Sequence, residues 1–326
     1  MIIGQHFTNK NIFSHSIFQS WLKNALKHSQ NKTILEPFAG KNSIITMLSE
    51  LKLINKFQSY DIIPQDKDVI QNDSIKNFPA NFKICITNPP FLARPIATKK
   101  KIDIDIYPYF DLYEKCIDLC LFNCDYVAVI IPESFIVTKY FKSRLFAVIS
   151  ITEKSIFNST EHPVCLALFN KEATRDFAVY RNEDFLGHYN SLKQKVDKFL
   201  NLEPLENIKF HCKYGQIGLI NIDATLKNKK INFCLGEIIP SDEVNSQSKL
   251  RTRIKIMTPK GKEPSKGQIS SFIKTANNLL LEYRMFSNDV FMTAFKGLNN
   301  DGKYRRRLDY TTAKKICALA YQFTFK

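Results

Sequence analysis

Short apolar runs alternate with amphipathic stretches through the first half of this chain, and this alternation constrains the fold more than any other feature. The runs are rich in branched apolar side chains, which is typical of strands that are buried on both faces. They occupy residues 32–38, 57–62, 82–88 and 126–132. Amphipathic helices are expected at 16–28, from about 43 onward and at 112–122. Strands separated by helices predict an α/β fold with a doubly wound, mostly parallel sheet.

Two later apolar runs, at 147–153 and 162–170, have no strong helical pattern between them. They therefore predict an antiparallel pair at one edge of the sheet. Beyond them the pattern changes to one alternating strand at 215–223, followed by helices at 268–286 and 311–321. Loops rich in glycine, proline and lysine separate these elements. We expect a first domain at 1–175 and a second, α+β domain at 176–326.

Composition excludes several classes of protein. The chain has 326 residues, enough for two buried cores, and 44% of them are hydrophobic. The first residues lack the pattern of a secretion signal, and no apolar run approaches the length of a membrane span. Eight cysteines are scattered without CxxC pairs, so we expect a cytoplasmic protein with reduced cysteines, no metal and no membrane association.

The positive charge is uneven along the chain. The net charge is +16, with 19 basic and 15 acidic residues in 1–170 but 28 and 16 in 171–326. Eight of the ten arginines lie in this second part. A guanidinium can bind phosphate or guanine with two parallel hydrogen bonds, so the second domain is predicted to bind nucleic acid. The candidate residues, each of which could instead belong to a solvated face, are Arg251, Arg253, Arg305, Arg306 and Arg307.

Polar residues follow the predicted strands at the edge where an open α/β sheet binds ligands. Glu36 ends the first run, and Gly40 follows where backbone can approach a ligand closely. Asp61 comes 21 residues after Gly40, at the spacing where a carboxylate meets ribose hydroxyls. Asp73 and Asn88 end the next two strand regions. A nucleoside-like ligand is therefore expected between these side chains.

The motifs at this edge occur in an order that resembles a known family. They are "GQHFT" (4–8), "LEPFAG" (35–40), "YDI" (60–62), "ND" (72–73), "TNPPF" (87–91), "PESF" (132–135) and "IFNSTEHPVCLALFNK" (156–171). Together they resemble the N6-adenine DNA methyltransferases that use S-adenosylmethionine. The resemblance covers residues 4–171 and implies a Rossmann-like methyltransferase sheet. It also implies double-stranded DNA as substrate and a restriction endonuclease as partner.

The resemblance assigns roles to individual residues. It places Thr8 at the cofactor carboxylate, Glu36 on the methionine side, Asp61 at the ribose and Asp73 at the adenine amino group. The full set of implied cofactor-binding residues is Gln5, Phe7, Thr8, Glu36, Pro37, Ala39, Gly40, Asp61, Ile62, Asp73, Ser74 and Asn88. Catalysis is assigned to Asn88, Pro89, Pro90 and Phe91, with Phe91 and Phe157 against the target base. On the residues alone, Asp61 and Asp73 could be turn residues and Phe157 could be core.

The chemistry of the Asn-Pro-Pro-Phe stretch fits this resemblance. The exocyclic amine of adenine is a poor nucleophile because its lone pair is delocalised into the ring. Two fixed acceptors, the Asn88 amide oxygen and the Pro89 carbonyl, could hold its hydrogens as a methyl group arrives. Such catalysis depends on positioning, which two prolines favour, and on extrusion of the base from the duplex.

The chain departs from the family pattern at one position, because Asn42 stands where a second glycine is usual. Asn is the best substitute for glycine in a left-handed conformation, so we expect that conformation at Asn42 and retained cofactor binding. Asn42 or Ser43 is also a candidate cap for the following helix.

The segment 92–110, after the catalytic motif, is either a lid that orders over DNA or a solvated loop. As a lid it would act through Arg94, Lys99 and Lys100. Two other functions remain open from the sequence. One is methylation of RNA or of a protein glutamine amide, and the other is a catalytically silent DNA-binding module.

Overall fold

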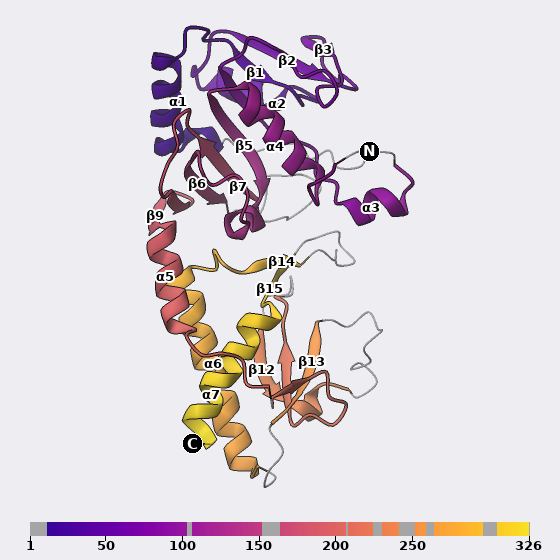
Figure 1. The fold of residues 1–326 in the computed structure, drawn as a ribbon, viewed down its shortest axis with the longest axis vertical. Coiled ribbons are helices and arrows are strands. Elements are labelled where there is room, and N and C mark those ends of the chain that lie inside the picture. Colours follow the sequence, from indigo (N-terminus) through magenta and orange to yellow (C-terminus); the bar gives the residue numbers. More distant parts are fainter. Residues whose placement is uncertain are drawn as a thin grey trace. The chain divides into compact units, whose positions relative to one another are not determined.

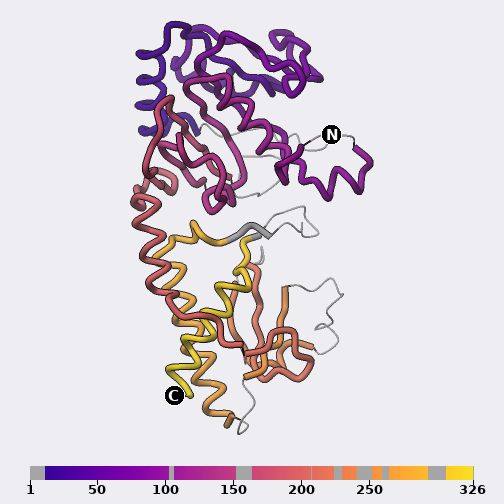
Figure 2. Tube along the Cα trace, viewed as in Figure 1, coloured from indigo at the N-terminus to yellow at the C-terminus, as the bar shows by residue number. Residues whose placement is uncertain are grey.

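The computed structural model divides the chain into two compact units, Met1–Tyr189 and Asn190–Lys326 (Figure 1). It describes residues 12–102, 106–151, 164–206, 208–223, 230–240, 252–258, 264–295 and 305–325. Each unit has its own sheet and its own hydrophobic core. The trace in Figure 2 follows the chain through the first unit and then, along one helix, into the second.

The first unit is built on a nine-stranded sheet in the order β3-β2-β1-β4-β5-β7-β6-β8-β9. Its strands are β1 (Ile34–Glu36), β2 (Phe57–Asp61), β3 (Val69–Gln71), β4 (Ile84–Thr87), β5 (Tyr126–Pro132), β6 (Leu145–Ile151), β7 (Val164–Phe169), β8 (Ala178–Arg181) and β9 (Asp184–His188). Strands β1 to β5 are all parallel. The strand order reverses between β1 and β4, which defines a topological switch point.

Helices cover both faces of this sheet, as the doubly wound prediction requires. They are η1 (Ile12–Ser14), α1 (Ser16–His28), α2 (Ser43–Glu50), α3 (Arg94–Lys99), α4 (Leu112–Asn123) and η2 (Glu133–Val137). Buried side chains of α1 and α2 share one cluster with alternate residues of β4 and β5. The thiol of Cys120 on α4 lies 3.7 Å from that of Cys85, a β4 residue outside that cluster. The parallel sheet and its helices therefore confirm the predicted fold class.

The predicted antiparallel pair exists, but it does not form the edge of the sheet. Strand β7 inserts between β5 and β6 and is antiparallel to both. Strand β8 then pairs in parallel with β6, and β9 closes the edge. The β8–β9 hairpin lies beyond residue 175, so the sheet extends the first unit past the boundary set from the sequence. These strands were not predicted because each is short and only half buried.

The second unit combines a four-stranded antiparallel sheet with helices. The sheet has the order β10-β13-β11-β12, formed by β10 (Lys209–Phe210), β11 (Ile217–Ile220), β12 (Asn232–Leu235) and β13 (Arg253–Met257). A hairpin joins β14 (Thr293–Phe295) to β15 (Arg305–Arg307). The helical elements are α5 (Tyr189–Phe199), η3 (Gly236–Ile238), α6 (Lys266–Ser287) and α7 (Tyr310–Phe325).

The core of the second unit lies between its sheet and its two long helices. Phe272, Ala276 and Leu280 of α6 and Ile316 of α7 share one buried cluster with strand residues such as Ile254. Helix α6 begins with a capping box in which Ser265 and Gln268 satisfy each other's backbone donors. The α+β character expected of this part of the chain is confirmed.

Two basic stretches that were expected to contact nucleic acid contribute to strands. The stretch 251–255 enters β13, which pairs with β10 and β11, and Lys255 within it is buried. The stretch 303–307, which was expected in a loop, ends in β15. It was misplaced because charged residues on a short strand carry no period that a sequence pattern can detect.

Within the part of the chain that the structure describes, no helix is long and apolar enough to cross a membrane. All eight cysteines are free thiols, and seven of them are buried. No group of three His, Cys, Asp or Glu residues among the described residues is placed to hold a metal ion.

Candidate active site

The candidate site lies at the carboxyl edge of the first sheet, where β1 and β4 run side by side in parallel. Glu36 is the last residue of β1, and Asn88 directly follows β4. The strand order reverses here, and this is the edge at which open α/β sheets bind ligands. The strand order thus brings the sequence-predicted residues Glu36 and Asn88 to adjacent strand ends, together with Thr87, which was not predicted as a site residue.

Glu36 is a buried carboxyl group with one oxygen engaged. Its Oε1 accepts hydrogen bonds from the Thr87 hydroxyl, 2.5 Å away, and from the Phe38 backbone N–H, 3.2 Å away. Its Oε2 is buried and has no hydrogen-bond partner among the described residues. Burial raises the pKa of Glu36 to about 8, and Asp61 adds to this, although the Thr87 and Phe38 hydrogen bonds oppose it. The carboxyl group is therefore mostly protonated at neutral pH.

The turn after β1 has the backbone conformation expected from the sequence. Gly40 has φ 53°, and Asn42 is left-handed with φ 60° and ψ 24°. Asn42 therefore does occupy the conformation that a second glycine would supply. Its side chain does not cap α2; instead Asn42 Oδ1 accepts a hydrogen bond of 2.7 Å from the buried hydroxyl of Ser59 on β2. The predicted cap by Asn42 is wrong because this tertiary bond competes for the same oxygen.

The Asp61 carboxylate accepts hydrogen bonds from the loop after β1 and from the loop after β2. Oδ2 accepts from the Gly40 N–H and Oδ1 from the Ile63 N–H, each at 2.8 Å. Only 6% of the residue is exposed, whereas the neighbouring Ile62 is 55% exposed. A carboxylate oxygen can accept more than one hydrogen bond, so these contacts hold Asp61 in place without using all of its acceptor capacity.

Asp73 forms a turn after β3, as one of its two sequence interpretations proposed. Its Oδ1 accepts from the backbone N–H of Ile75 at 3.1 Å and of Lys76 at 3.3 Å. Ser74 is buried, and its hydroxyl accepts a hydrogen bond from the Asn72 amide. The cofactor roles of Asp73 and Ser74 remain predictions.

The Asn-Pro-Pro-Phe stretch directly follows β4, and none of its four residues is fully exposed. Pro89 is buried, while Asn88, Pro90 and Phe91 are half-buried. The Phe91 ring meets the Tyr113 ring edge to face at 5.9 Å, with an interplanar angle of 81°. Tyr113 belongs to α4, so this contact fixes the aromatic end of the stretch to a helix. Pro37 is also buried, and Ala39 is half-buried.

Several predicted site residues lie outside the described part of the chain. These are Gln5, Phe7, Thr8, Phe157 and Arg251. Arg305 lies on β15, opposite Phe295, and its side chain is not described.

The remaining predicted DNA-binding residues fall into two groups. Arg94, Lys99 and Lys100 are exposed on α3 and just beyond it, and Arg94 donates a hydrogen bond to the Tyr109 carbonyl. In the second unit, Arg306 forms an ion pair of 3.1 Å with Asp289, and the Arg307 guanidinium lies 4.9 Å from the Tyr310 ring centre. Arg253 is half-buried. The two groups belong to different units and are not placed relative to each other.

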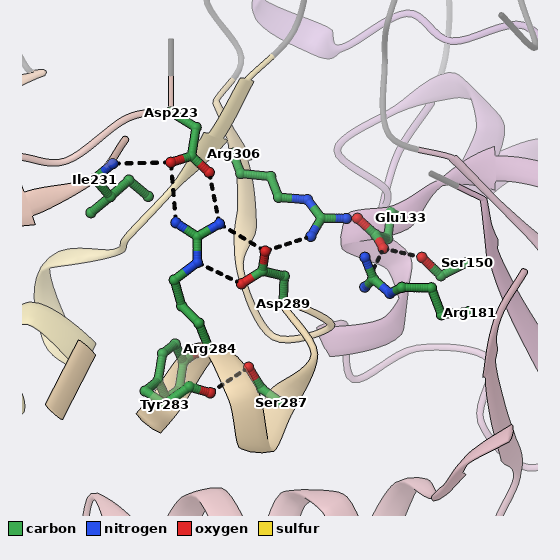
Figure 3. A network of polar contacts seen from close by, with 10 residues as sticks. All are labelled: Glu133, Ser150, Arg181, Asp223, Ile231, Tyr283, Arg284, Ser287, Asp289 and Arg306. Atoms are coloured by element: carbon green, nitrogen blue, oxygen red, sulfur yellow. Dashed lines mark hydrogen bonds and ion pairs between the residues drawn. The ribbon is translucent and has the colours of Figure 1, made fainter. Parts of the chain in front are cut away.

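Two ionic networks, one around the buried Glu133 and one half-buried, were not predicted from the sequence. In the first unit, Glu133 of the "PESF" stretch accepts hydrogen bonds from Ser150 and Arg181 (Figure 3). In the second unit, Arg284 binds Asp223 and Asp289 at once through four hydrogen bonds of 2.8–3.1 Å (Figure 3).

Burial disfavours the charged form of Arg284, but the hydrogen bonds that the guanidinium donates to Asp289 and Asp223 outweigh it and raise its pKa. No sequence signal pairs residues that are 61 positions apart, as Arg284 and Asp223 are.

No protein-family model matches the chain, and no curated protein matches it. Solved structures with a similar fold include a proposed class I S-adenosylmethionine-dependent methyltransferase from Listeria monocytogenes. It is 14% identical with a TM-score of 0.41, over 56% of this chain and 68% of that one.

A type I restriction-modification methyltransferase subunit from Streptococcus thermophilus is 12% identical with a TM-score of 0.37, over 55% of this chain and 48% of that one. The type IIG restriction endonuclease BpuSI is 10% identical with a TM-score of 0.41, over 69% of this chain and 38% of that one. The chain thus spans less than half of the second and third structures.

Proposed function

We propose that this protein transfers a methyl group from S-adenosylmethionine to N6 of an adenine extruded from double-stranded DNA. One observation carries the proposal. The switch point brings a buried acid with a spare oxygen, a left-handed glycine-asparagine turn and the Asn-Pro-Pro-Phe stretch to adjacent strand ends. The motif order from "LEPFAG" to "TNPPF" supports the same reading.

The residues at this edge fit the cofactor. A sulfonium and an ammonium group both carry positive charge, and Glu36 offers a buried carboxyl oxygen with no other partner among the described residues. A bound cation beside Glu36 would lower its raised pKa and favour the carboxylate form. The left-handed Gly40 and Asn42 shape a turn in which backbone can approach a ligand closely. Asp61 retains acceptor capacity for ribose hydroxyls, and the exposed Ile62 beside it offers apolar surface to an adenine ring.

The chain's own contribution to the reaction is positioning. When bound, the cofactor supplies an electrophilic methyl group. Asn88 and the Pro89 carbonyl accept hydrogen bonds from the amino group of the target base, and the two prolines restrict the backbone that carries these acceptors. Phe91 holds the face of the base, and its ring is held in turn by Tyr113. No strong base is needed for this chemistry.

We further propose that the basic second unit binds the DNA and that the protein protects it from a partner restriction endonuclease. The net charge of +12 in residues 171–326 supports the first part of this proposal. Because Arg306 and Arg307 also make contacts within the protein, they would present less free charge to DNA than their sequence suggests.

Radiolabelled S-adenosylmethionine, offered with DNA, RNA and protein extract in parallel, tests the proposal. Label is expected in DNA, and enzymatic digestion should recover it as N6-methyladenine. Label in RNA or in protein alone would assign the enzyme to the rival substrate classes. Cofactor binding measured by calorimetry without any transfer to DNA would favour the silent DNA-binding module.

A further inference from the structure

Residues 92–102 and 106–110, the described parts of the segment 92–110, are held as a lobe by contacts with the start of α4. Ala93 and Asp111 form an antiparallel bridge at its base, and the Arg94 N–H donates to the Phe110 carbonyl at 2.9 Å. The Asp111 carboxylate also accepts from the Leu92 N–H at 2.9 Å, which ties the lobe to the first turn of α4. The two ends of the lobe are therefore held together directly after the Asn-Pro-Pro-Phe stretch.

A small hydrophobic cluster anchors the lobe to the candidate site. Leu92, Ala97 and Ile106 of the lobe are buried against Leu112 and Cys116 of α4. Phe38, from the turn after β1, packs against the same cluster. The lobe is thus fixed to both strand ends that carry the site, and its outer surface has a defined position at that edge.

Aromatic rings gather where this lobe meets the loop after η2. The Tyr109 ring lies 6.4 Å from the Tyr140 ring and 5.6 Å from the Phe141 ring. Tyr140 is 58% exposed, and Tyr107 on the lobe is 76% exposed. We call Tyr109, Tyr140 and Phe141 the aromatic platform. Since η2 follows β5, the neighbour of β4, the platform lies at the same carboxyl edge as Asn88.

The backbone of the platform is held in an unfavourable conformation. Phe141 has φ 58°, which is rare for a bulky side chain. Lys142 beside it directs its ammonium to the carbonyls of Phe135 and Ile136, at 2.9 Å and 3.2 Å. This anchoring keeps the two rings of residues 140 and 141 at the surface, where strained positions often serve binding.

Basic residues outnumber acidic ones on the lobe, although the exposed Asp118 of α4 interacts with the Tyr109 phenol. Lys99, Lys100 and Lys139 are exposed nearby in sequence, and Arg94 donates to the Tyr109 carbonyl. The carboxylates of Asp111 and Glu114 face inward in the capping box of α4. Burial raises the pKa of Tyr109 to about 12, with Asp118 contributing, so the phenol stays neutral. Residues 92–110 carry four basic and two acidic residues.

We propose that the aromatic platform binds an unpaired DNA nucleotide next to the target adenine, by stacking on its base, with the lobe lysines on the flanking phosphates. Proteins bind single-stranded nucleic acid with exposed aromatic rings beside basic side chains, because each base can stack on a ring and each phosphate linkage carries a negative charge. This inference rests on the proposed function only in that base extrusion creates the unpaired nucleotide.

Binding of a fluorescent single-stranded DNA oligonucleotide to the full chain, without cofactor, tests the platform. Fluorescence anisotropy should show about five- to one-hundred-fold weaker binding for Tyr140→Ala, and near-normal binding for Tyr140→Phe, which keeps the ring. The combined change Lys99→Gln and Lys100→Gln should flatten the salt dependence, by about 0.7 in logarithmic slope for each phosphate that the variant no longer neutralises. Phe122→Ala is the control, because Phe122 is 88% exposed near the opposite end of α4.

The inference is overturned if wild-type protein does not bind single-stranded DNA, if Tyr140→Ala binds it as wild type does, or if Phe122→Ala weakens binding equally. Tighter binding of an RNA oligonucleotide of the same sequence would overturn the assignment to DNA. Because this assay contains no cofactor, it is independent of methyl transfer. Platform-dependent binding without any transfer would therefore refute the proposed function and leave the platform standing.

Discussion

The hydroxyl of Thr87 donates a hydrogen bond to Oε1 of Glu36 over 2.5 Å, and this bond joins the ends of two adjacent parallel strands. Thr87 ends β4 and is fully buried, and Glu36 ends β1 and is 1% exposed. The buried carboxyl group is therefore bonded to the residue that directly precedes Asn88 in the chain. Its protonation state matters both for stability and for binding a cation.

The free energy of unfolding should depend on pH through Glu36. The pKa of Glu36 is about 8 in the folded protein and 4.5 in its ordinary state. Between these pH values the folded protein holds a proton that the unfolded chain has released, so stability falls as pH rises through this window. The decrease is about 1.4 kcal/mol per pH unit at most. In Glu36→Gln, which cannot ionise, this contribution is absent, and urea denaturation at a series of pH values measures it.

The control for this prediction is Glu50→Gln, an exposed acid at the end of α2. The free energy of unfolding of Glu36→Gln, relative to that of wild type, should increase from pH 5 to pH 8. For Glu50→Gln the difference from wild type should stay constant over the same range. Parallel stability curves for wild type and Glu36→Gln would show that the buried carboxyl group carries no such linkage.

Asn42 should tolerate glycine better than alanine. The left-handed backbone at Asn42 costs an ordinary L-residue about 1–2 kcal/mol, and glycine avoids this cost but is more flexible when unfolded. Both substitutions remove the hydrogen bond from the Ser59 hydroxyl. Asn42→Ala should therefore be less stable than Asn42→Gly by about 1 kcal/mol in chemical denaturation. Equal stability, or a more stable alanine variant, would contradict the role given to the backbone.

Much of the first sheet could be predicted because the central strands are recognisable from their own residues. Strands β4 and β5 are buried on both faces, so nearly every residue in them is apolar. Asn42 could also be predicted, since few residues other than glycine and asparagine adopt a left-handed turn. In these cases the local sequence and the tertiary structure impose the same choice.

The contacts of the site could not be predicted, because partners distant in the chain decide them. Asp61 binds Gly40 with one oxygen and Ile63 with the other, and no pattern distinguishes that from a free carboxylate. Arg306 looked like a phosphate ligand by composition, but the fold places it against Asp289. Strand β15 forms by pairing with β14 and by a bridge between Arg307 and Ile222, and short strands of charged residues have no periodicity of their own.

Removing Arg284 should destabilise the second unit far more than removing an exposed cation. Arg284→Ala leaves Asp223 and Asp289 facing each other without the guanidinium that binds both, at positions only about one-fifth exposed. Asp289 keeps its ion pair with Arg306, and the network is only half-buried, so the loss should be about 2 kcal/mol rather than the larger cost of breaking a fully buried pair. The matched control is Lys193→Ala, which breaks the exposed pair with Asp197 and should cost less than about 1 kcal/mol. Urea denaturation of both variants measures the difference, and similar destabilisation would show that the network is not a stabilising centre.

Asn88→Ala should abolish methyl transfer while leaving cofactor affinity within a few-fold of wild type. The amide is proposed to hold the amino group of the target base, and misplacement of a reacting group costs about 100-fold or more in rate. Single-turnover transfer to DNA measures the rate, and calorimetry measures cofactor affinity.

Asn88→Asp keeps an acceptor oxygen in the same place and should retain more activity than Asn88→Ala. Asn24→Ala, on the exposed face of α1, controls for the removal of an amide elsewhere. Transfer by Asn88→Ala within ten-fold of wild type would mean that another group accepts the hydrogen bonds of the target amine, since the Pro89 carbonyl alone cannot orient both of its hydrogens.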